Sequence, residues 1–288
     1  MLLVEKELER EDKLICEMKF GLLVQRETII PPFSSKVSRS IILINLNKLD
    51  LKNLKLAFSL KNKPLRITPL MVKNKPLLKI KKDKFSFLTL LPNKNYEFSI
   101  SVIGSDLVQD LMILSKELKE EIEIYNSKIH VYPKEIKICS LKNLGLKDSK
   151  YFYIRIVTPA LLQLPKPWKL KKARHFLFPI PSLILYSLVK HWNTFADSNL
   201  YIKNIHGFVW RSNYLLTEVD YNLKPVTVIY DEEKEIRGFI VSIIYELRAR
   251  KNTLFYKYVK VLFDYANYFG IGRSRSIGFG LCEINSYE

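Results

Sequence analysis

The sequence predicts an α+β protein made of two tandem ferredoxin-like domains, each ordered strand, helix, two strands, helix, strand (βαββαβ). Three observations carry this prediction. Strand-like and helix-like segments follow that order in residues 1–142 and again in residues 143–288. The chain has 288 residues, of which 48% are hydrophobic, and that length suits two domains that each bury a core. A glycine-rich loop separates the last helix from the last strand.

The first half begins with a strand. Over residues 14–24, apolar side chains alternate with polar or small ones, which is the two-residue period of a strand. Pro31 and Pro32 then predict an extended loop, and Ser34 or Ser35 is expected to cap the helix that follows. Further strands are expected at residues 55–60, 76–81, 85–91, 96–104 and 128–139, and a second helix at residues 105–118.

The second half follows the same order. Strands are expected at residues 150–158, 201–210, 225–230, 236–247 and 280–284, and helices at residues 181–196 and 254–269. Gly270 is expected to end the last helix in the left-handed conformation that commonly follows a helix C-terminus. The two halves show no sequence similarity to each other, so the repeat rests on the order of the elements.

The charge balance favours a polyanionic partner. The chain carries 47 Lys and Arg against 29 Asp and Glu, a net charge of +18, and a basic surface that serves only solubility is the alternative. The basic residues are clustered: residues 61–84 hold nine Lys or Arg and one acid, and residues 165–175 hold five and no acid. The basic cluster in 165–175 adds an aromatic residue to its cations, and its candidates for nucleic-acid contact are Trp168, Lys169, Lys171, Lys172 and Arg174.

Composition also excludes several classes of protein. No apolar run reaches the roughly 18 to 20 residues of a membrane helix, and the N-terminus lacks the pattern of a secretion signal. Cys16, Cys139 and Cys282 are far apart in strand-like stretches, which fits buried thiols in a reducing cytoplasm better than disulfides or a zinc site. Neither a metal nor another cofactor is expected.

The glycine-rich loop reads GIGRSRSIGFG over residues 270–280 and holds four of the nine glycines in the chain. Glycine permits positive backbone φ angles and the close approach of another backbone. Backbone amides in such a loop can hold phosphates, and arginine and serine side chains add hydrogen bonds to a phosphodiester. The residues of this loop expected to contact phosphates are Gly270, Gly272, Arg273, Ser274, Arg275, Ser276 and Gly278.

Two nucleotide-binding motifs do not fit this loop. A dinucleotide-binding loop runs from strand to helix, whereas this loop runs from helix to strand and has Arg275 where the third glycine belongs. No Gly-Lys-Ser or Gly-Lys-Thr of a P-loop occurs. A tight helix-to-strand turn without a ligand stays open as the alternative.

The loop resembles that of the repeat-associated RNA-binding (RAMP) superfamily, and within it the endoribonucleases that cut CRISPR precursor transcripts in their repeats. The resemblance rests on a Gly-hydrophobic-Gly pair, five residues and a second such pair after a helix. Weaker similarity covers PPFSSKVSRSIIL at 31–43, VTPALL at 157–162, LKPVTVIY at 223–230 and LFDYANYF at 262–269. The resemblance implies tandem ferredoxin-like domains and CRISPR repeat RNA, single-stranded or weakly structured, bound along a basic surface. It also implies cleavage without a metal that leaves a 5′-hydroxyl and a 2′,3′-cyclic phosphate.

Many members of that family use a histidine in the N-terminal half, but this chain has none before His130, which is expected to be an ordinary strand residue. The resemblance places the active-site helix after Pro31, where it offers Lys36 and Arg39, and Lys63 is expected to converge on them. The chain therefore resembles archaeal members that lack the catalytic histidine. The alternative is that these cations only face solvent or hold RNA.

RNA transesterification needs a deprotonated 2′-hydroxyl, stabilised charge on phosphorus and a proton for the leaving oxygen. Arg39 stays charged and suits the phosphate, whereas a lysine becomes an acid or base only if its pKa falls. A like charge about 5 Å away, at an effective dielectric near 20, lowers a lysine pKa by about two units. Slow, largely electrostatic catalysis that is faster at alkaline pH is therefore expected.

Two further residues, Arg237 and Trp168, each have one functional and one structural interpretation. Arg237 is expected to position the phosphate or to face solvent at a strand end, and Trp168 to stack on a base or to lie in a core. His175, at the end of the basic cluster in 165–175, is a candidate for RNA contact. A non-catalytic RNA-binding subunit of a CRISPR effector complex is the alternative function. A homodimer would suit unstructured RNA, but no residue demonstrates it.

Overall fold

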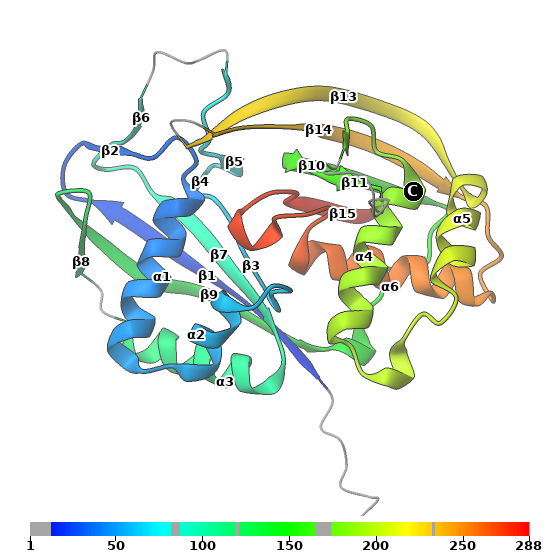
Figure 1. Ribbon diagram of the computed structural model, residues 1–288, viewed down its shortest axis with the longest axis horizontal. Coiled ribbons are helices and arrows are strands. Elements are labelled where there is room, and N and C mark those ends of the chain that lie inside the picture. Colours follow the sequence, from blue (N-terminus) through cyan, green and yellow to red (C-terminus); the bar gives the residue numbers. More distant parts are fainter. Residues whose placement is uncertain (1–12, 82–86, 119–120, 165–173, 232–233, 288) are drawn as a thin grey trace, which may run out of the picture.

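A computed structural model describes residues 13–81, 87–118, 121–164, 174–231 and 234–287, which form two α+β parts side by side (Figure 1). The N-terminal part comprises β1 (Leu14–Val24), β2 (Thr28–Ile30), α1 (Ser35–Leu49), α2 (Lys52–Ser59), β3 (Leu65–Ile67), β4 (Met71–Val72), β5 (Lys75–Pro76), β6 (Leu88–Leu90), β7 (Tyr96–Ile103), α3 (Ser105–Glu117), β8 (Glu121–Ile124) and β9 (Ser127–Ser140).

The main N-terminal sheet has the order β5-β4-β7-β1-β9-β8, and β3 also pairs with β7. β1 is central and runs antiparallel to both β7 and β9. The side chains of β1 alternate between the two faces of the sheet, as the sequence predicts. Cys16, Met18, Phe20 and Leu22 are fully buried against α1, α2 and α3. The opposite face of the sheet carries charged side chains, such as the ion pair between Lys19 and Glu135 at 2.9 Å.

The C-terminal part comprises η2 (Leu141–Asn143), β10 (Tyr151–Ala160), β11 (Leu162–Gln163), β12 (His175–Phe176), α4 (Pro181–Phe195), η3 (Ser198–Leu200), α5 (Ile205–Leu215), β13 (Leu216–Asp231), β14 (Lys234–Leu247), α6 (Leu254–Phe269), η4 (Arg275–Ile277) and β15 (Cys282–Tyr287). Its sheet has the order β13-β14-β10-β15, with the first and third strands of the repeat in the centre. This is the ferredoxin-like order, so the predicted α+β fold class is confirmed.

Two of the predicted strands are helices. Residues 55–60 lie mostly in α2, where Leu54, Ala57 and Phe58 are buried at helical spacing, and residues 201–210 lead into α5. A short apolar run is compatible with either period, and in both places tertiary packing selects the helix. The start of α5 did carry a signal, since the Asn204 side chain accepts a hydrogen bond from the Gly207 amide at 2.9 Å.

The serines before α1 do not cap it, which corrects the sequence prediction. Ser34 Oγ instead donates to the Leu77 carbonyl at 2.5 Å and accepts from the Leu70 amide at 3.0 Å. Ser35 Oγ donates to the carbonyl of Ile277 at 2.7 Å, although the two residues lie 242 positions apart. Both hydroxyls therefore attach the start of α1 to distant segments.

The β13–β14 hairpin extends beyond its own sheet and reaches across to the N-terminal part (Figure 1). There the Ile229 amide donates to the Lys79 carbonyl at 2.9 Å. Between the two parts lies a small separate apolar cluster whose buried members are Phe33, Leu161, Val228 and Phe279. The hairpin, the glycine-rich loop and the start of α1 therefore meet in one place.

Two larger apolar clusters form the cores, one built mainly from residues 16–131 and the other mainly from residues 141–284. The division of the chain at residues 142/143 stays a prediction. No helix in the part of the chain that the structure describes is long and apolar enough to cross a lipid bilayer.

Candidate functional site

Two adjacent hollows lie where the two parts of the molecule meet. The larger, here called the large groove, has a volume of about 740 Å³. It is lined by Lys61, Asn62, Lys63, Leu65, Leu161, Gln163, Leu164, Tyr186, Ser187, Lys190, His191, Thr194, Phe195 and Gly272–Ile277. The smaller, here called the small hollow, has a volume of about 310 Å³ and is lined by Ser35, Lys36, Arg39, Ser40, Leu43, Tyr125, Tyr230 and Ile277. Ile277 borders both.

Lys36 lies in the first turn of α1 and faces the tip of the β13–β14 hairpin. Its Nζ forms an ion pair with Asp231 Oδ2 at 2.7 Å and lies 4.9 Å from the centroid of the Tyr230 ring. The hairpin from the C-terminal part therefore fixes a cation of the N-terminal part.

Arg39 and Lys63 lie close together, as the sequence predicts for these two. The Arg39 guanidinium stacks 5.7 Å from the centroid of the Phe58 ring, and Lys63 Nζ donates to the carbonyls of Phe58 and, at 2.7 Å, Leu60. Partial burial lowers the pKa of Lys63 below its ordinary value, and the positive Arg39 lowers it further. Lys63 lines the large groove, whereas Lys36 and Arg39 line the adjacent small hollow, so the convergence of all three cations stays a prediction.

The glycine-rich loop is packed into the molecule, which corrects part of the phosphate-cradle prediction. The amide of Gly270 donates to Ala266 O at 2.7 Å, that of Gly272 to Ser187 Oγ at 3.1 Å and that of Gly278 to Arg275 O at 3.1 Å. These three glycine amides are therefore not available to an RNA phosphate. Gly270 has a positive φ of 72° but an extended ψ of −176°, so the predicted left-handed helical cap is wrong as well.

Close backbone packing explains why glycines stand here. A Cβ on Gly280 would lie 1.8 Å from the Ile271 carbonyl oxygen, and one on Gly272 would lie 2.9 Å from the Leu161 oxygen. A Cβ on Gly278 would lie 3.0 Å from atoms of Pro69 and Ser35 in the N-terminal part. The loop is consequently pressed against β10–β11 on one side and the start of α1 on the other.

The two arginines of the loop differ. Arg273 is exposed, and its guanidinium donates to the Gln163 side chain at the edge of the large groove. Arg275 turns inward and donates to the carbonyls of Ser187 at 3.1 Å and Gly270 at 3.4 Å. Burial lowers the pKa of Arg275 to about 10. The guanidinium of Arg275 therefore has a structural role, because its donors hold α4 to the loop, while the RNA contact of this residue stays a prediction.

Three amides in the middle of the loop remain available. Among the described residues, none accepts a hydrogen bond from the amides of Ser274, Arg275 and Ser276. Ser274 has the left-handed φ of 61°, which starts the short turn η4 and brings consecutive amides together. All three residues line the large groove.

The remaining predicted contacts are placed as follows. Arg237 is exposed on β14, and Arg174 is exposed with its guanidinium 5.1 Å from the centroid of the Phe176 ring. His175 is exposed, and its pKa is lowered by partial burial and by the charge of Arg273. Trp168, Lys169, Lys171 and Lys172 lie outside the residues that the structure describes.

His191 in α4 lines the large groove but has both ring nitrogens engaged. Nε2 lies 3.2 Å from the Lys63 carbonyl, which can only accept, so Nε2 donates and Nδ1 accepts from the Tyr265 hydroxyl at 2.6 Å. Burial and the positive Arg275 hold the pKa of His191 well below its ordinary value. A neutral His191 therefore ties α4 to the Lys63 segment.

Within the described part of the chain, no three His, Cys, Asp or Glu side chains gather in a group that could hold a metal ion.

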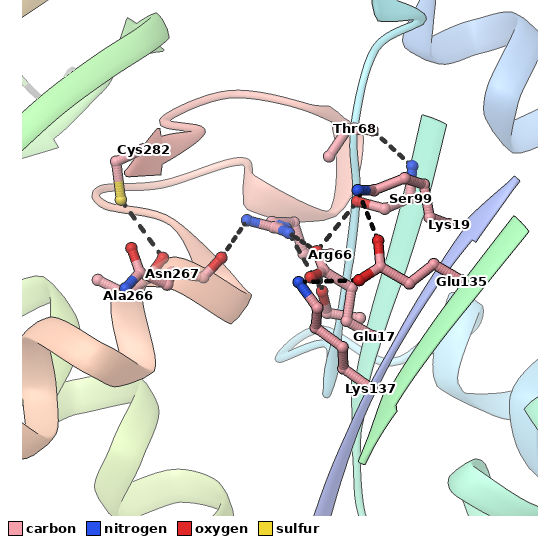
Figure 2. A network of polar contacts seen from close by, with 11 residues as sticks. Glu17, Lys19, Arg66, Thr68, Ser99, Glu135, Lys137, Ala266, Asn267 and Cys282 are labelled. Atoms are coloured by element: carbon pink, nitrogen blue, oxygen red, sulfur yellow. Dashed lines mark hydrogen bonds and ion pairs between the residues drawn. The ribbon is translucent and has the colours of Figure 1, made fainter. Parts of the chain in front are cut away.

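A buried arginine, Arg66, also joins the two parts near the glycine-rich loop (Figure 2). Arg66 in β3 is 2% exposed, and its Nη2 lies 2.6 Å from Glu17 Oε1 in β1. Its Nη1 donates to the Asn267 carbonyl at 2.9 Å, in the last turn of α6 just before the glycine-rich loop. Arg66 therefore determines how the loop sits relative to the N-terminal sheet.

Among the side chains of the two hollows that the sequence analysis did not single out are Lys61, Tyr125, Lys190 and Tyr230. Tyr125 had a recognisable signal, because Tyr125–Asn126 is a two-residue connection between short alternating strands, where Asn-Gly is usual. Lys61 is two positions from Lys63, whereas Lys190 and Tyr230 lie on elements whose relation to Lys63 or Lys36 depends on the tertiary fold.

Two family profiles together match most of the chain. One described as the Cas6 N-terminal domain matches residues 16–139, and one described as CRISPR-associated endoribonuclease Cas6 matches residues 154–282. A Saccharolobus solfataricus protein, CRISPR-associated endoribonuclease Cas6 1, is 24% identical over 288 residues, covering 93% of this chain and 95% of its own. A second from that organism, CRISPR-associated endoribonuclease Cas6 2, is 27% identical over 190 residues, covering 58% of this chain and 63% of its own.

Solved structures share the fold. A Cas6 product complex has a TM-score of 0.66 and 14% identity over 94% of this chain and 99% of that chain. A Thermus thermophilus Cas6 has a TM-score of 0.64 and 13% identity over 94% and 98%. A Cas6-related protein of Pyrococcus furiosus has a TM-score of 0.55 and 15% identity over 96% and 100%. At such identities the likeness concerns the arrangement of both domains.

Proposed function

The chain belongs to the Cas6 family of CRISPR-associated endoribonucleases, and from this premise we propose that it binds CRISPR repeat RNA and cuts the precursor transcript without a metal ion. The products are a 5′-hydroxyl and a 2′,3′-cyclic phosphate. The observation that carries this mechanism is the group of Lys36, Arg39 and Lys63, which lines the two adjacent hollows beside the glycine-rich loop.

Lys63 is the proposed base. A neutral amine keeps two N–H groups, which can still donate to the carbonyls of Phe58 and Leu60, and its lone pair is then free for the 2′-hydroxyl proton. The lowered pKa of Lys63 makes this neutral form accessible at a lower pH than for an ordinary lysine. The 2′-oxygen then forms its bond to phosphorus as the bond from phosphorus to the 5′-oxygen breaks.

Arg39 and Lys36 act on the charges that develop. Arg39 stays charged and donates to the non-bridging phosphate oxygens as they gain negative charge. Lys36 donates a proton to the leaving 5′-oxygen, and Asp231, at 2.7 Å, stabilises the ammonium until the phosphate arrives. The proton lost by the 2′-hydroxyl and the proton gained by the 5′-oxygen balance the reaction.

The large groove is the proposed path of the RNA strand. It presents the exposed cations Lys61, Lys190 and Arg273, and the open amides of residues 274–276. These are the groups that hold a phosphodiester backbone without reading its sequence. The net charge of +18 adds long-range attraction for RNA.

The test is a cleavage assay with a repeat transcript in excess chelator, followed by analysis of the fragment ends. Lys36→Ala and Arg39→Ala should each lower the single-turnover rate at least about 100-fold, with RNA affinity within about threefold. Lys48→Ala, an exposed lysine in the last turn of the same helix, is the matched control and should cut like the unaltered protein. Fragments with 3′-hydroxyl ends, or no cutting in chelator, would refute the mechanism.

A further inference from the structure

The small hollow has walls from three separate places in the fold. α1 contributes Lys36, Arg39 and Ser40, the β8–β9 turn contributes Tyr125, and the tip of the β13–β14 hairpin contributes Tyr230. At about 310 Å³ it lies at the lower end of ligand-pocket volumes, roughly 300 to 1,000 Å³, so it suits a single small planar group.

Tyr125 occupies a backbone conformation that its side chain disfavours. Tyr125 and Asn126 form the two-residue turn between β8 and β9, with φ angles of 54° and 56°. Such a turn prefers Asn-Gly, and a bulky residue with positive φ is a rare exception. Backbone strain of this kind is concentrated at functional positions. The side chain of Tyr125 is 40% exposed and lines the small hollow.

Tyr230 is fixed on the other side of α1. Its ring packs against Phe33 with centroids 5.6 Å apart and lies 4.9 Å from Lys36 Nζ. Because it is held by the hairpin and the interdomain apolar cluster, its position needs no rearrangement when a ligand enters.

Arg39 has spare hydrogen-bonding capacity at the small hollow. Arg39 Nε is buried and has no hydrogen-bond partner within the described part of the chain. Burial raises the pKa of the Tyr125 phenol, with the Ser40 hydroxyl and the Lys36 charge opposing the shift, so the phenol stays neutral and keeps its O–H donor. Aromatic faces beside arginine and hydroxyl donors are what proteins use to hold an unpaired nucleobase.

We propose that the small hollow receives one unpaired nucleobase of the RNA, the one next to the cut phosphate, which stacks on Tyr125. Its edge faces the guanidinium of Arg39. The inference rests on the proposed function, since it takes the cut phosphate to lie over Arg39 and Lys63. Tyr125 thereby helps to determine which phosphate of the repeat is cut.

The test is a double-mutant cycle between protein and RNA. A set of repeat transcripts, each with one base removed, is cut under single-turnover conditions by the unaltered protein, by Tyr125→Leu and by Tyr287→Leu. Tyr287 is 47% exposed at the end of β15, outside both hollows, and is the matched control. Removal of the base beside the cut should slow the unaltered protein about tenfold, and Tyr125→Leu should slow the intact transcript to a similar degree.

The two changes together should slow cleavage no more than either alone, while Tyr287→Leu keeps the full base dependence. Independent, multiplying effects, or a Tyr125→Leu variant that cuts normally, would overturn the proposal. A thermal melt that matches the unaltered protein excludes misfolding as the cause.

If the unaltered protein cuts no repeat, the proposed function fails, and the hollow is then tested by binding alone. A single 2-aminopurine in the transcript should be quenched at one position, and Tyr125→Leu should abolish that quenching; no such position would refute the base site.

Discussion

Lys63 shows how a common surface residue acquires an unusual environment. Its amine is partly buried, it donates to two carbonyls at the end of α2, and it lies near the positive Arg39. Burial and like charge both disfavour the ammonium, so the pKa falls. The neutral fraction of Lys63 therefore rises with pH, starting below the range in which an ordinary lysine titrates.

Arg39→Gln is expected to move the alkaline limb of the cleavage pH profile to higher pH. The variant removes the like charge, so the pKa of Lys63 rises and the neutral base forms later. Single-turnover rates from pH 6 to 10 measure the limb, whose position is independent of the overall loss of rate. Lys48→Gln is the control on the same helix. A limb that stays in place or moves to lower pH would remove Lys63 as the base.

At the scale of elements, the glycine-rich loop acts as a packed connector whose middle faces the large groove. Its glycines allow backbone segments of both domains to approach, while residues 273–276 stand at the groove. The same eleven residues therefore combine structural positions with positions that face the large groove, and substitutions at the two kinds of position should have different effects.

Gly280→Ala should lower the melting temperature by about 5 to 10 °C, because the new Cβ would lie 1.8 Å from the Ile271 oxygen and the backbone must shift. Gly104→Ala is the matched control: Gly104 also has a positive φ, of 121°, but nothing lies within 4 Å of a Cβ there. Calorimetry of both variants separates the steric clash from backbone strain. Equal losses would show that strain alone accounts for the glycine.

Arg273→Ala should weaken repeat-RNA binding and reduce the slope of log affinity against log salt by about one ion, since an exposed phosphate contact is lost. Arg275→Ala should mainly lower thermal stability, because two carbonyls lose their donor. Filter binding at several salt concentrations, beside a melt of each variant, distinguishes them. The assignment would be reversed if Arg275→Ala changed the salt slope while Arg273→Ala did not.

At the scale of the whole molecule, the site depends on how the two domains are joined. Lys36 meets Asp231, His191 meets the Lys63 carbonyl, and Arg66 reaches the end of α6 (Figure 2). Each contact joins the N-terminal part to the C-terminal part. The cations of the N-terminal part therefore face the loop of the C-terminal part only while this junction holds.

Arg66→Met should destabilise the protein by about 3 to 5 kcal/mol, because it leaves the mostly buried Glu17 carboxylate without its partner. Arg155→Met is the control: its ion pair with Glu283, at 3.4 Å, has side chains 39% and 54% exposed and should cost at most about 1 kcal/mol. Urea denaturation gives both values. The double variant Glu17→Met/Arg66→Met should recover part of the loss, and a failure to do so would indicate that packing, not the unpaired charge, is responsible.

Much of the fold can be predicted from the sequence wherever the apolar residues follow a single period, that of a strand or that of a helix, over a long segment. The strand at residues 14–24 and the last helix at residues 254–269 have the predicted bounds, because alternation and helical spacing there extend over many residues. Residues 55–60 were ambiguous because the run is short, and α2 formed where its apolar face could pack.

The candidate site likewise has some features that the sequence predicts and others that it does not. The sequence alone determined the fold class, the basic character of the surface and the place of the glycine-rich loop, because these follow from local period, charge and glycine spacing. Only the tertiary structure decided that Arg275 turns inward while Arg273 stays exposed, and that Tyr125 and Tyr230 meet beside Lys36. The physical reason is that the hydrogen-bond partner of Arg275 and the walls of the small hollow come from residues far away in the chain. Local sequence patterns do not specify which distant residues will be in contact.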